Sequence, residues 1–351
     1  MYEQFYGLTA KPFQLNPDPS FFFGSRGHRR AYSYLQYGLY QGEGFIVLTG
    51  EVGAGKTTLI RNLLQQLDLA KVNAVQLVST QLDADSLLRA VAIAFGLPVR
   101  DHDKARLIAE IEAYLVSLVL QQKRALLIVD EAQNLTPQAV EELRMLSNFQ
   151  LNDQALLQSF LVGQPELRQL MRSPSMQQFR QRVIASYHLG PLDSDETRAY
   201  IQHRLKHVGW TGDPRIVEQA FDMMHAFTGG IPRRINTLCN RVLLAVYLSE
   251  KHSIGSEEVE DVIVELNKEF GEKAPTGPEG ASKIGAGSFE NGARTPTDAE
   301  PFVIVDAGDV MRLERRIARI EKAMTTTISL LRQVIVLTNT RTATAGKKET
   351  G

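Results

Sequence analysis

The sequence predicts an α/β fold in which a parallel sheet lies between two layers of helices. Five short apolar runs alternate with amphipathic stretches of helical periodicity, as in parallel sheets whose strands are covered on both faces. A glycine-rich motif directly after the first run supports this class, because it connects a strand to a helix. The five predicted strands span residues 45–49, 74–78, 125–129, 157–162 and 183–189.

The first predicted strand leads directly into a phosphate-binding loop. Residues 50–57 fit the pattern G-x-x-x-x-G-K-[ST], in which glycines let backbone N–H groups and a helix N-terminus point at a polyphosphate. Lys56 supplies a charge near the β- and γ-phosphates, and Thr57 supplies a hydroxyl ligand for Mg²⁺. The strand before the motif and the helix after it disfavour an ordinary glycine-rich turn. The predicted nucleotide-binding residues are Gly50, Glu51, Val52, Gly53, Ala54, Gly55, Lys56, Thr57 and Thr58.

The third predicted strand ends in two carboxylates, Asp130 and Glu131, as a Walker B element does. At the end of a strand beside the loop, Asp130 can hold the Mg²⁺ shell together with Thr57. Glu131 can then act as the general base or orient the water that attacks the γ-phosphate. Taken alone, Asp130 and Glu131 would be interpreted as two acidic residues that begin a loop. The phosphate-binding loop earlier in the sequence favours the catalytic interpretation.

Polar residues also stand at the ends of the last two predicted strands. Gln164 follows the fourth strand, where its amide can hold the attacking water or touch the γ-phosphate, and a plain turn residue is the alternative. Arg180 and Arg182 come just before the fifth strand and can reach the γ-phosphate of a neighbouring subunit. That role requires an oligomer. As solvated surface arginines they would have no role.

Residues 193–270 show only helical periodicity and predict a small all-helical lid after a core at residues 41–192. The helical patterns lie near residues 195–208, 215–227, 233–248 and 256–270. Pro232 is favourable at the start of the third helix, and Arg233, preferred over Arg234, can reach from there across the interdomain cleft to the nucleotide. A surface ion pair is the alternative for Arg233.

The segments before and after the predicted core and lid differ from them in composition and pattern. Residues 1–40 form an N-terminal arm expected to pack on the core, with the phenylalanines at 21–23 near the adenine. The alternative is an aromatic and basic surface for single-stranded nucleic acid, completed by Arg26, His28, Arg29 and Arg30. Residues 271–308 have the composition of a flexible linker, 309–338 carry coiled-coil heptads, and 339–351 read as a disordered tail. Whether the coiled coil pairs within or between chains is left open.

Bulk composition indicates a globular protein without a preferred class of partner. The 351 residues are 43% apolar and 23% charged, with a formal net charge of −1 that favours neither nucleic acid nor an anionic membrane. The sequence shows neither a signal-peptide pattern nor a transmembrane segment, which would need ~20 consecutive apolar residues. We therefore expect a cytoplasmic location, with attachment to the inner membrane through a partner left open.

The combination of loop, acidic pair, strand-end glutamine, arginines and helical lid resembles the AAA+ ATPases over residues 1 to about 270. Within them, the sequence is similar to the ExeA (general secretion pathway protein A) group and to the ATPase encoded with exosortase, PEP-CTERM protein sorting and exopolysaccharide loci. The strings that carry this resemblance are Phe5-Tyr6-Gly7-Leu8, Pro12-Phe13, Asn16-Pro17-Asp18, Asp130-Glu131-Ala132-Gln133-Asn134-Leu135 and Gly163-Gln164-Pro165-Glu166-Leu167.

The resemblance implies a three-layer P-loop nucleotide domain, ATP with Mg²⁺, and catalysis at the subunit interfaces of a ring-like homo-oligomer. It implies Gln164 as sensor 1 and Arg233 as sensor 2. The ExeA group continues into a transmembrane helix and a peptidoglycan-binding domain, whereas this sequence continues into the linker and heptads. A role in cell-wall remodelling is therefore not expected from the resemblance.

Three functions are compatible with these sequence features. The leading one is an ATP-driven conformational switch acting on a secretion, protein-sorting or exopolysaccharide-export assembly. The second is a DNA-binding regulator of the transposition target-selection or origin-recognition type, which shares the same core but usually carries an appended DNA-binding domain that is not seen here. The third is a nucleotide-gated scaffold with negligible turnover, in which the heptads do the binding.

Overall fold

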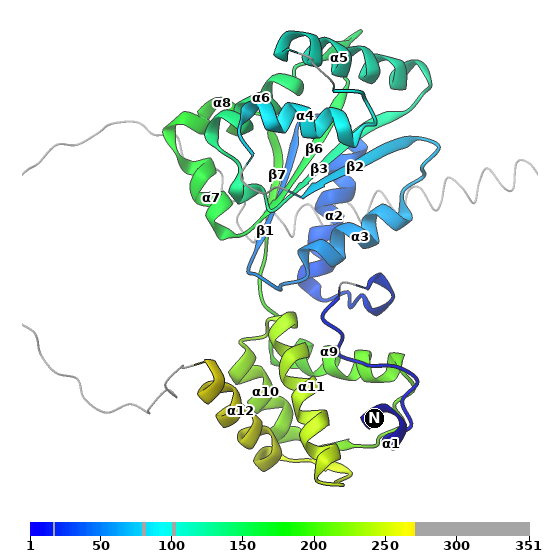
Figure 1. The fold of residues 1–351 in the computed structure, drawn as a ribbon, viewed down its shortest axis with the longest axis vertical. Coiled ribbons are helices and arrows are strands. Elements are labelled where there is room, and N and C mark those ends of the chain that lie inside the picture. Colours follow the sequence, from blue (N-terminus) through cyan, green and yellow to red (C-terminus); the bar gives the residue numbers. More distant parts are fainter. Residues whose placement is uncertain (17, 79–81, 100–102, 271–351) are drawn as a thin grey trace, which may run out of the picture. The chain divides into compact units, whose positions relative to one another are not determined.

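A five-stranded, fully parallel sheet forms the centre of the first part of the protein (Figure 1). The computed structural model describes residues 1–16, 18–78, 82–99 and 103–270, so the predicted linker, coiled coil and tail lie outside the described residues. The strand order is β2-β3-β6-β1-β7. These strands are β1 (Phe45–Gly50), β2 (Val72–Val78), β3 (Arg124–Asp130), β6 (Leu157–Gly163) and β7 (Val183–Leu189). All five lie where the apolar runs predicted them.

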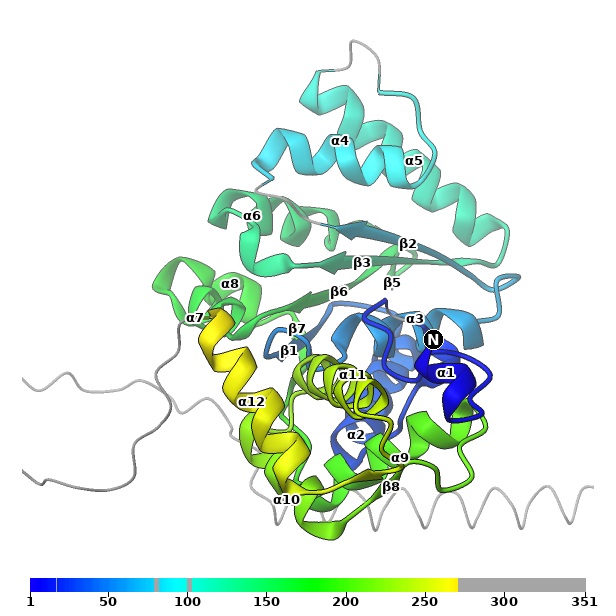
Figure 2. The ribbon, with the colours of Figure 1, turned by 60° about the horizontal axis from the view of Figure 1, so that its bottom comes forward.

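Helices cover both faces of this sheet, which confirms the predicted three-layer α/β class (Figure 2). Side chains of β1 alternate between the layers, with Phe45 and Val47 in one buried cluster and Ile46 and Leu48 in the other. One face is covered by α2 (Arg26–Gln41) and α3 (Lys56–Gln66). The other is covered by α4 (Ala84–Ala94), α5 (Lys104–Leu120), α6 (Pro137–Leu146), α7 (Pro165–Arg172) and α8 (Gln177–Arg180).

Polar side chains fix where several of these helices begin. Asp83, Asp103 and Thr136 each accept a hydrogen bond from a backbone N–H in the first turn of α4, α5 and α6. The parallel register aligns the strand ends, with Thr49 opposite Gly163 and Val78 opposite Asp130. The carboxyl ends of β1, β3 and β6 therefore lie together at one edge of the sheet, where ligands bind in open α/β sheets.

Some short elements have no counterpart in the sequence predictions. A hairpin of β4 (Gln150–Leu151) and β5 (Gln154–Ala155) precedes β6. Its turn residues Asn152 and Asp153 have φ of 49° and 63°, which matches the positive-φ turns that two-residue hairpins favour. Three 3₁₀ segments occur as well, η1 (Pro19–Phe21), η2 (Ala132–Asn134) and η3 (Pro174–Met176).

Up to residue 270, where the described part of the chain ends, four helices follow the sheet and pack around an apolar core of their own. They are α9 (Ser194–His207), α10 (Glu218–Thr228), α11 (Pro232–Leu248) and α12 (Ser256–Phe270). One detail corrects the expectation of an all-helical lid. Residues 215–216, where the second helix was expected to begin, form strand β8 (Arg215–Ile216), which pairs in parallel with β9 (Ser253–Ile254).

The N-terminal arm divides between the two parts of the structure, which corrects the expectation that it packs on the sheet-containing core throughout. Its helix α2 does pack on β1 and β7. The preceding segment, from α1 (Tyr2–Phe5) to Phe21, instead contributes Tyr2, Tyr6, Phe13 and Phe21 to the buried core of the lid. Aromatic burial of this size ties the first residues of the chain to the helices that follow the sheet.

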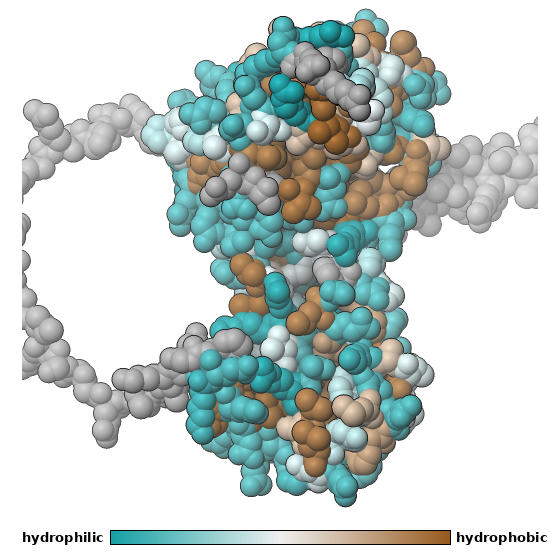
Figure 3. All heavy atoms as spheres, viewed as in Figure 1, coloured by the Kyte–Doolittle hydropathy of each residue, from teal (hydrophilic) through white to brown (hydrophobic). Residues whose placement is uncertain are grey.

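The surface drawn in Figure 3 is hydrophilic over much of its area. This agrees with a chain that buries its apolar side chains in three clusters, two flanking the sheet and one inside the lid. Among the described residues, none of the helices combines the length and the apolar character needed to cross a membrane.

Candidate nucleotide-binding site

The phosphate-binding loop closes tightly between β1 and α3. Gly53 and Gly55 have φ of 83° and 97°, which residues with a side chain rarely adopt. A Cβ atom on Gly55 would lie 2.7 Å from His28 Nε2, and one on Gly53 would lie 2.4 Å from Arg233 Cβ. Both glycines are therefore needed for the conformation and for the close neighbours of the loop.

Lys56 begins helix α3 and is only 7% exposed. Its Nζ donates hydrogen bonds to the carbonyl oxygens of Gly50, at 2.7 Å, and Glu51, at 2.9 Å. Burial lowers the pKa of this ammonium, and the nearby carboxylates of Glu131 and Asp130 oppose that shift. The loop thus holds the buried Lys56 ammonium against its own backbone, at the place where a phosphate group would bind.

Thr57 and Asp130 meet across the ends of α3 and β3. Thr57 Oγ1 donates to Asp130 Oδ2 at 3.1 Å, and Gln76 Nε2 on β2 lies 3.4 Å from the same oxygen. Asp130 is 4% exposed, and burial raises the pKa of its carboxyl group. A hydroxyl and a carboxylate are hard oxygen donors of the kind Mg²⁺ takes beside substrate phosphates, so this pair fits the predicted metal.

Glu131 follows Asp130 in the left-handed conformation, with φ of 54°. Its Oε2 accepts two hydrogen bonds, from Gln133 Nε2 at 2.7 Å and from Gln164 Nε2 at 3.1 Å. Burial raises the pKa of Glu131, but these hydrogen bonds and the charge of Lys56 outweigh it, so the pKa is lowered overall. The carboxylate is ionised at neutral pH, as a general base must be.

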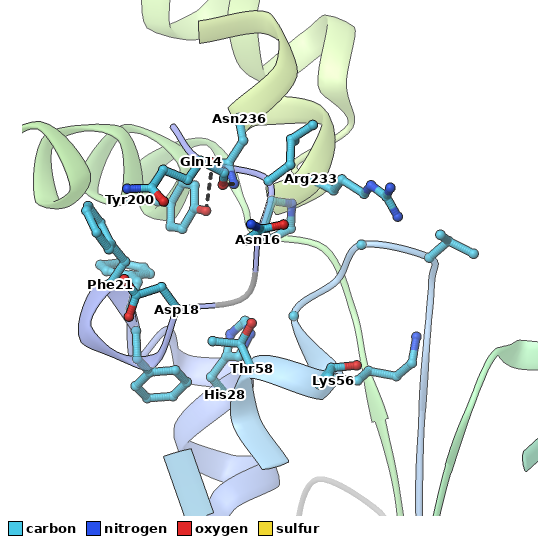
Figure 4. A pocket seen from close by; sticks show the side chains of 18 of the residues that line it. Gln14, Asn16, Asp18, Phe21, His28, Lys56, Thr58, Tyr200, Arg233 and Asn236 are labelled. Atoms are coloured by element: carbon cyan, nitrogen blue, oxygen red, sulfur yellow. Dashed lines mark hydrogen bonds between the residues drawn. The ribbon is translucent and has the colours of Figure 1, made fainter. Parts of the chain in front are cut away.

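Most of these residues line one cavity of about 420 Å³ between the sheet ends, the lid and the N-terminal arm, and Asp130 lies behind Thr57 (Figure 4). Such a volume lies in the range of small-molecule sites. Lys56 and Thr57 of the phosphate-binding loop line it, and so do Glu131, Gln164 and Arg233, which come from three other predicted positions. The remaining lining residues are Gln14, Leu15, Asn16, Asp18, Phe21, Phe22, Phe23, His28, Val52, Gly53, Gly55, Thr58, Tyr200, Arg204, Pro232 and Asn236.

The lid contacts the loop directly through the start of α11. The backbone N–H of Arg233 donates to Gly53 O at 3.2 Å, and the Arg233 side chain is exposed beside the cavity. Figure 4 shows this side chain extending over the loop. Pro232 is the first residue of α11, a position where its missing N–H costs no helical hydrogen bond, and the N–H groups that follow it point out of the helix end. Arg233 therefore lies beside both the loop and the cavity.

The two arginines before β7 lie elsewhere. Arg180 Nη1 donates to Met171 O and Ser173 O at 2.7 and 2.8 Å, which ties α8 to the end of α7. Arg182 Nη1 donates to Ser147 O at 3.2 Å. Neither side chain lines the cavity described above. A role for either in nucleotide chemistry would therefore have to be exercised on another subunit, which is the role predicted from the sequence.

His28 belongs to the basic group for which a nucleic-acid surface was only the alternative, and no role in the nucleotide site was predicted for it. It is 5% exposed and lies beneath the phosphate-binding loop. Its Nδ1 is 2.7 Å from Ser25 Oγ, and its ring also makes a hydrogen bond with the backbone of Ala54. Burial lowers the pKa of His28, so a neutral imidazole supports the loop at neutral pH.

Arg204 organises the other side of the cavity and was also not foreseen. It is 6% exposed, and its guanidinium lies 4.7 Å from the centre of the Phe21 ring. It donates to Pro12 O at 2.6 Å and to the Tyr200 hydroxyl at 2.9 Å. The Tyr200 hydroxyl in turn donates to Asn236 Oδ1 at 2.9 Å. One buried cation thus fixes the N-terminal arm on the lid, and Figure 4 shows its partners grouped along this wall.

We expect Arg204→Met to weaken binding of ATP more than binding of tripolyphosphate. The substitution leaves Pro12 O and the Tyr200 hydroxyl without their hydrogen-bond donor, which costs about 1–3 kcal/mol for each buried group. These contacts lie on the side of the cavity away from Lys56, so we expect the phosphate-binding loop to be unaffected. Competition of both ligands against a fluorescent nucleotide measures the difference. Lys206→Met, on the exposed face of the same helix, is the matched control. The expected difference assumes that this wall contacts the adenosine part of ATP, which tripolyphosphate lacks, and an equal loss for the two ligands would contradict that expectation.

Comparison with known proteins agrees with this geometry. Residues 39–171 match the AAA domain family. General secretion pathway protein A of Aeromonas hydrophila is 40% identical over 255 residues, which make up 72% of this chain and 46% of that protein. The match therefore spans about half the length of the curated relative.

Solved structures share the fold at low sequence identity. Cdc6p from Pyrobaculum aerophilum has a TM-score of 0.55 with 17% identity, over 70% of this chain and 70% of that chain. The Aeropyrum pernix ORC2 protein, solved as ADPNP–ADP complexes, has a TM-score of 0.51 with 17% identity, over 68% of this chain and 66% of that chain. The described part of the chain therefore has the P-loop AAA+ fold, and its residues 39–171 match the AAA domain family.

Proposed function

We propose that this protein binds ATP with Mg²⁺ and hydrolyses it. The observation that carries the proposal is a cavity lined by Lys56, Thr57, Glu131 and Gln164, with Asp130 hydrogen-bonded to Thr57 behind it. Lys56 would hold the β- and γ-phosphates. Thr57 and Asp130 would hold Mg²⁺, which when bound neutralises part of the phosphate charge.

Glu131 is the proposed base. A water on the cavity side of the carboxylate would give its proton to Glu131 as it attacks the γ-phosphate, and ADP would leave with the charge held by Lys56. Gln164 is 3.1 Å from the same carboxylate, so its amide can orient both the base and the water. Phosphoryl transfer depends mainly on such positioning and on charge stabilisation, which is what this set of side chains supplies.

Domain closure would respond to the nucleotide through the lid. Arg233 belongs to α11, while the loop that its backbone contacts belongs to the sheet-containing core. Its exposed guanidinium can bind the γ-phosphate, and loss of that phosphate would release one of the links between lid and loop. Arg180 or Arg182 of a neighbouring subunit would complete the site in a ring-like homo-oligomer, which makes hydrolysis depend on assembly.

The proposed biological role is to drive assembly or conformational changes in a secretion system. It is supported by the 40% identity to a general secretion pathway protein A, whose name assigns that protein to secretion. The narrower proposal, from the sequence strings alone, is an exosortase-linked sorting or exopolysaccharide-export system. The alternative, a DNA-binding regulator, is supported only by a fold shared with Cdc6p and ORC2 at 17% identity.

One experiment tests the proposal and separates it from the DNA-binding alternative. Phosphate release from ATP is measured with the full chain at two salt concentrations, with and without duplex DNA. We expect Mg²⁺-dependent release that DNA leaves unchanged. Strong stimulation by DNA that fades at higher salt would favour the regulator instead, because phosphate contacts weaken steeply with salt. Absence of release under all conditions would contradict hydrolysis.

A further inference from the structure

Gln133 lies at the centre of the contacts around Glu131, although no predicted role was given to it. Both the nitrogen and the oxygen of its side-chain amide form hydrogen bonds. Gln133 Nε2 donates to Glu131 Oε2 at 2.7 Å, and Gln133 Oε1 accepts from the backbone N–H of Gln164 at 3.0 Å. The amide therefore bridges the end of β3 to the end of β6.

The local backbone is arranged to bring Gln133 into this position. Glu131 adopts the left-handed conformation, and the 3₁₀ segment η2 follows directly, so the chain turns back within three residues. At the opposite strand end, a Cβ atom on Gly163 would lie 2.8 Å from Gln133 Oε1 and 3.3 Å from Gln133 N. A glycine at 163 is thus what lets Gln133 lie against the tip of β6.

The bridge restricts the carboxylate of Glu131 in a particular way. Gln133 and Gln164 both donate to Oε2, so this oxygen is held from two sides, while Oε1 takes no part in that pair of hydrogen bonds. Of the two donors, Gln133 makes the shorter hydrogen bond. Because Gln133 also holds the backbone of Gln164, it fixes the positions of both partners relative to each other.

We propose that Gln133 is a positioning residue for ATP hydrolysis, which holds Glu131 by Oε2 and presents Oε1 to the attacking water. This inference rests on the proposed function, since it assigns Glu131 the role of base. Gln133 itself does not line the cavity and so acts on the reaction through Glu131. Its removal should change the rate of the chemical step and leave nucleotide binding, which depends on Lys56 and Thr57, nearly intact.

The first test compares kcat and KM for ATP in the full-length protein and three variants. Gln133→Met keeps the length of the side chain and removes both hydrogen bonds, and we expect kcat to fall about 10- to 100-fold with KM little changed, since a small misplacement of a catalytic group has effects of this size. Gln138→Met, on the exposed face of α6, is the matched control and should behave like the parent.

Gln133→Glu separates the two ends of the bridge. A carboxylate can still accept from Gln164 N–H but cannot donate to Glu131, and it adds a like charge beside it. We expect a loss at least as large as for Gln133→Met. Parent-like kcat in Gln133→Glu would overturn the proposal, because it would mean that holding the backbone of Gln164 is sufficient. This variant also serves if Gln133→Met fails to fold.

A double variant tests whether Gln133 acts through Glu131. Adding Gln133→Met to Glu131→Gln should cause no further loss in the residual rate, because residues that act as a unit are not additive. A further loss of tenfold would overturn the proposal. If the parent hydrolyses ATP, Glu131→Gln does not, and Gln133→Met behaves like the parent, only this inference fails. If the parent shows no turnover, the proposed function fails and this inference fails with it.

Discussion

Lys56→Ala is expected to abolish measurable ATP binding while leaving the fold intact. The lysine Nζ is the buried cation of the loop, and each charged hydrogen bond that it would make to a phosphate is worth about 1.5–3 kcal/mol. Loss of contacts to two phosphates therefore weakens binding by at least about 100-fold. Equilibrium binding of a fluorescent ATP analogue measures the affinity, and thermal unfolding reports on the fold.

The matched control for this variant is Lys71→Ala. Lys71 is an exposed lysine whose Nζ lies 3.1 Å from Asp68 at the surface, and exposed pairs of this kind contribute little to stability. We expect its ATP affinity to equal that of the parent. Retained affinity in Lys56→Ala, with the control unchanged, would remove the loop from the nucleotide site.

Glu131→Gln is expected to bind ATP but to hydrolyse it about 10²- to 10⁴-fold more slowly, the usual contribution of a general base. The substitution keeps the size of the side chain, so the contacts of Gln133 and Gln164 have a comparable partner. Since nucleotide stays bound, we also expect the variant to accumulate in its assembled form with ATP. Single-turnover hydrolysis and sedimentation velocity measure the two effects.

Glu112→Gln provides the comparison, because it makes the same chemical change on an exposed position of α5. It should match the parent in both measurements. Unchanged hydrolysis in Glu131→Gln would exclude it as the base. If the protein is instead a scaffold without turnover, the parent itself will show no ATP hydrolysis.

The sheet could be predicted from the sequence because each of its strands contains a short stretch rich in apolar residues, flanked by polar segments. In β1 and β6 every residue is buried, which is the condition under which such runs identify a parallel strand. The loop after β1 and the carboxylates after β3 are local patterns of a few residues. Their side chains meet because parallel strands end at a common edge, and that could be foreseen as well.

The parts that could not be predicted depend on contacts between distant positions. Arg204 is 192 residues from Pro12, and no spacing in the sequence indicates that its guanidinium ends at that carbonyl. The aromatic residues of the arm, such as Tyr6 and Phe13, follow neither helical nor strand periodicity, so the lid was not foreseen as their partner. His28 lies among arginines, and nothing in its sequence neighbours indicates that its ring is buried beneath the loop.

The most direct test of this nucleotide site is phosphate release from ATP by the 351-residue chain, measured beside Lys56→Ala purified in the same way. We predict release that requires Mg²⁺ and saturates with ATP, and that is absent from the variant. Equal release by the two proteins, or none by either, would contradict the claim that this cavity binds and hydrolyses ATP.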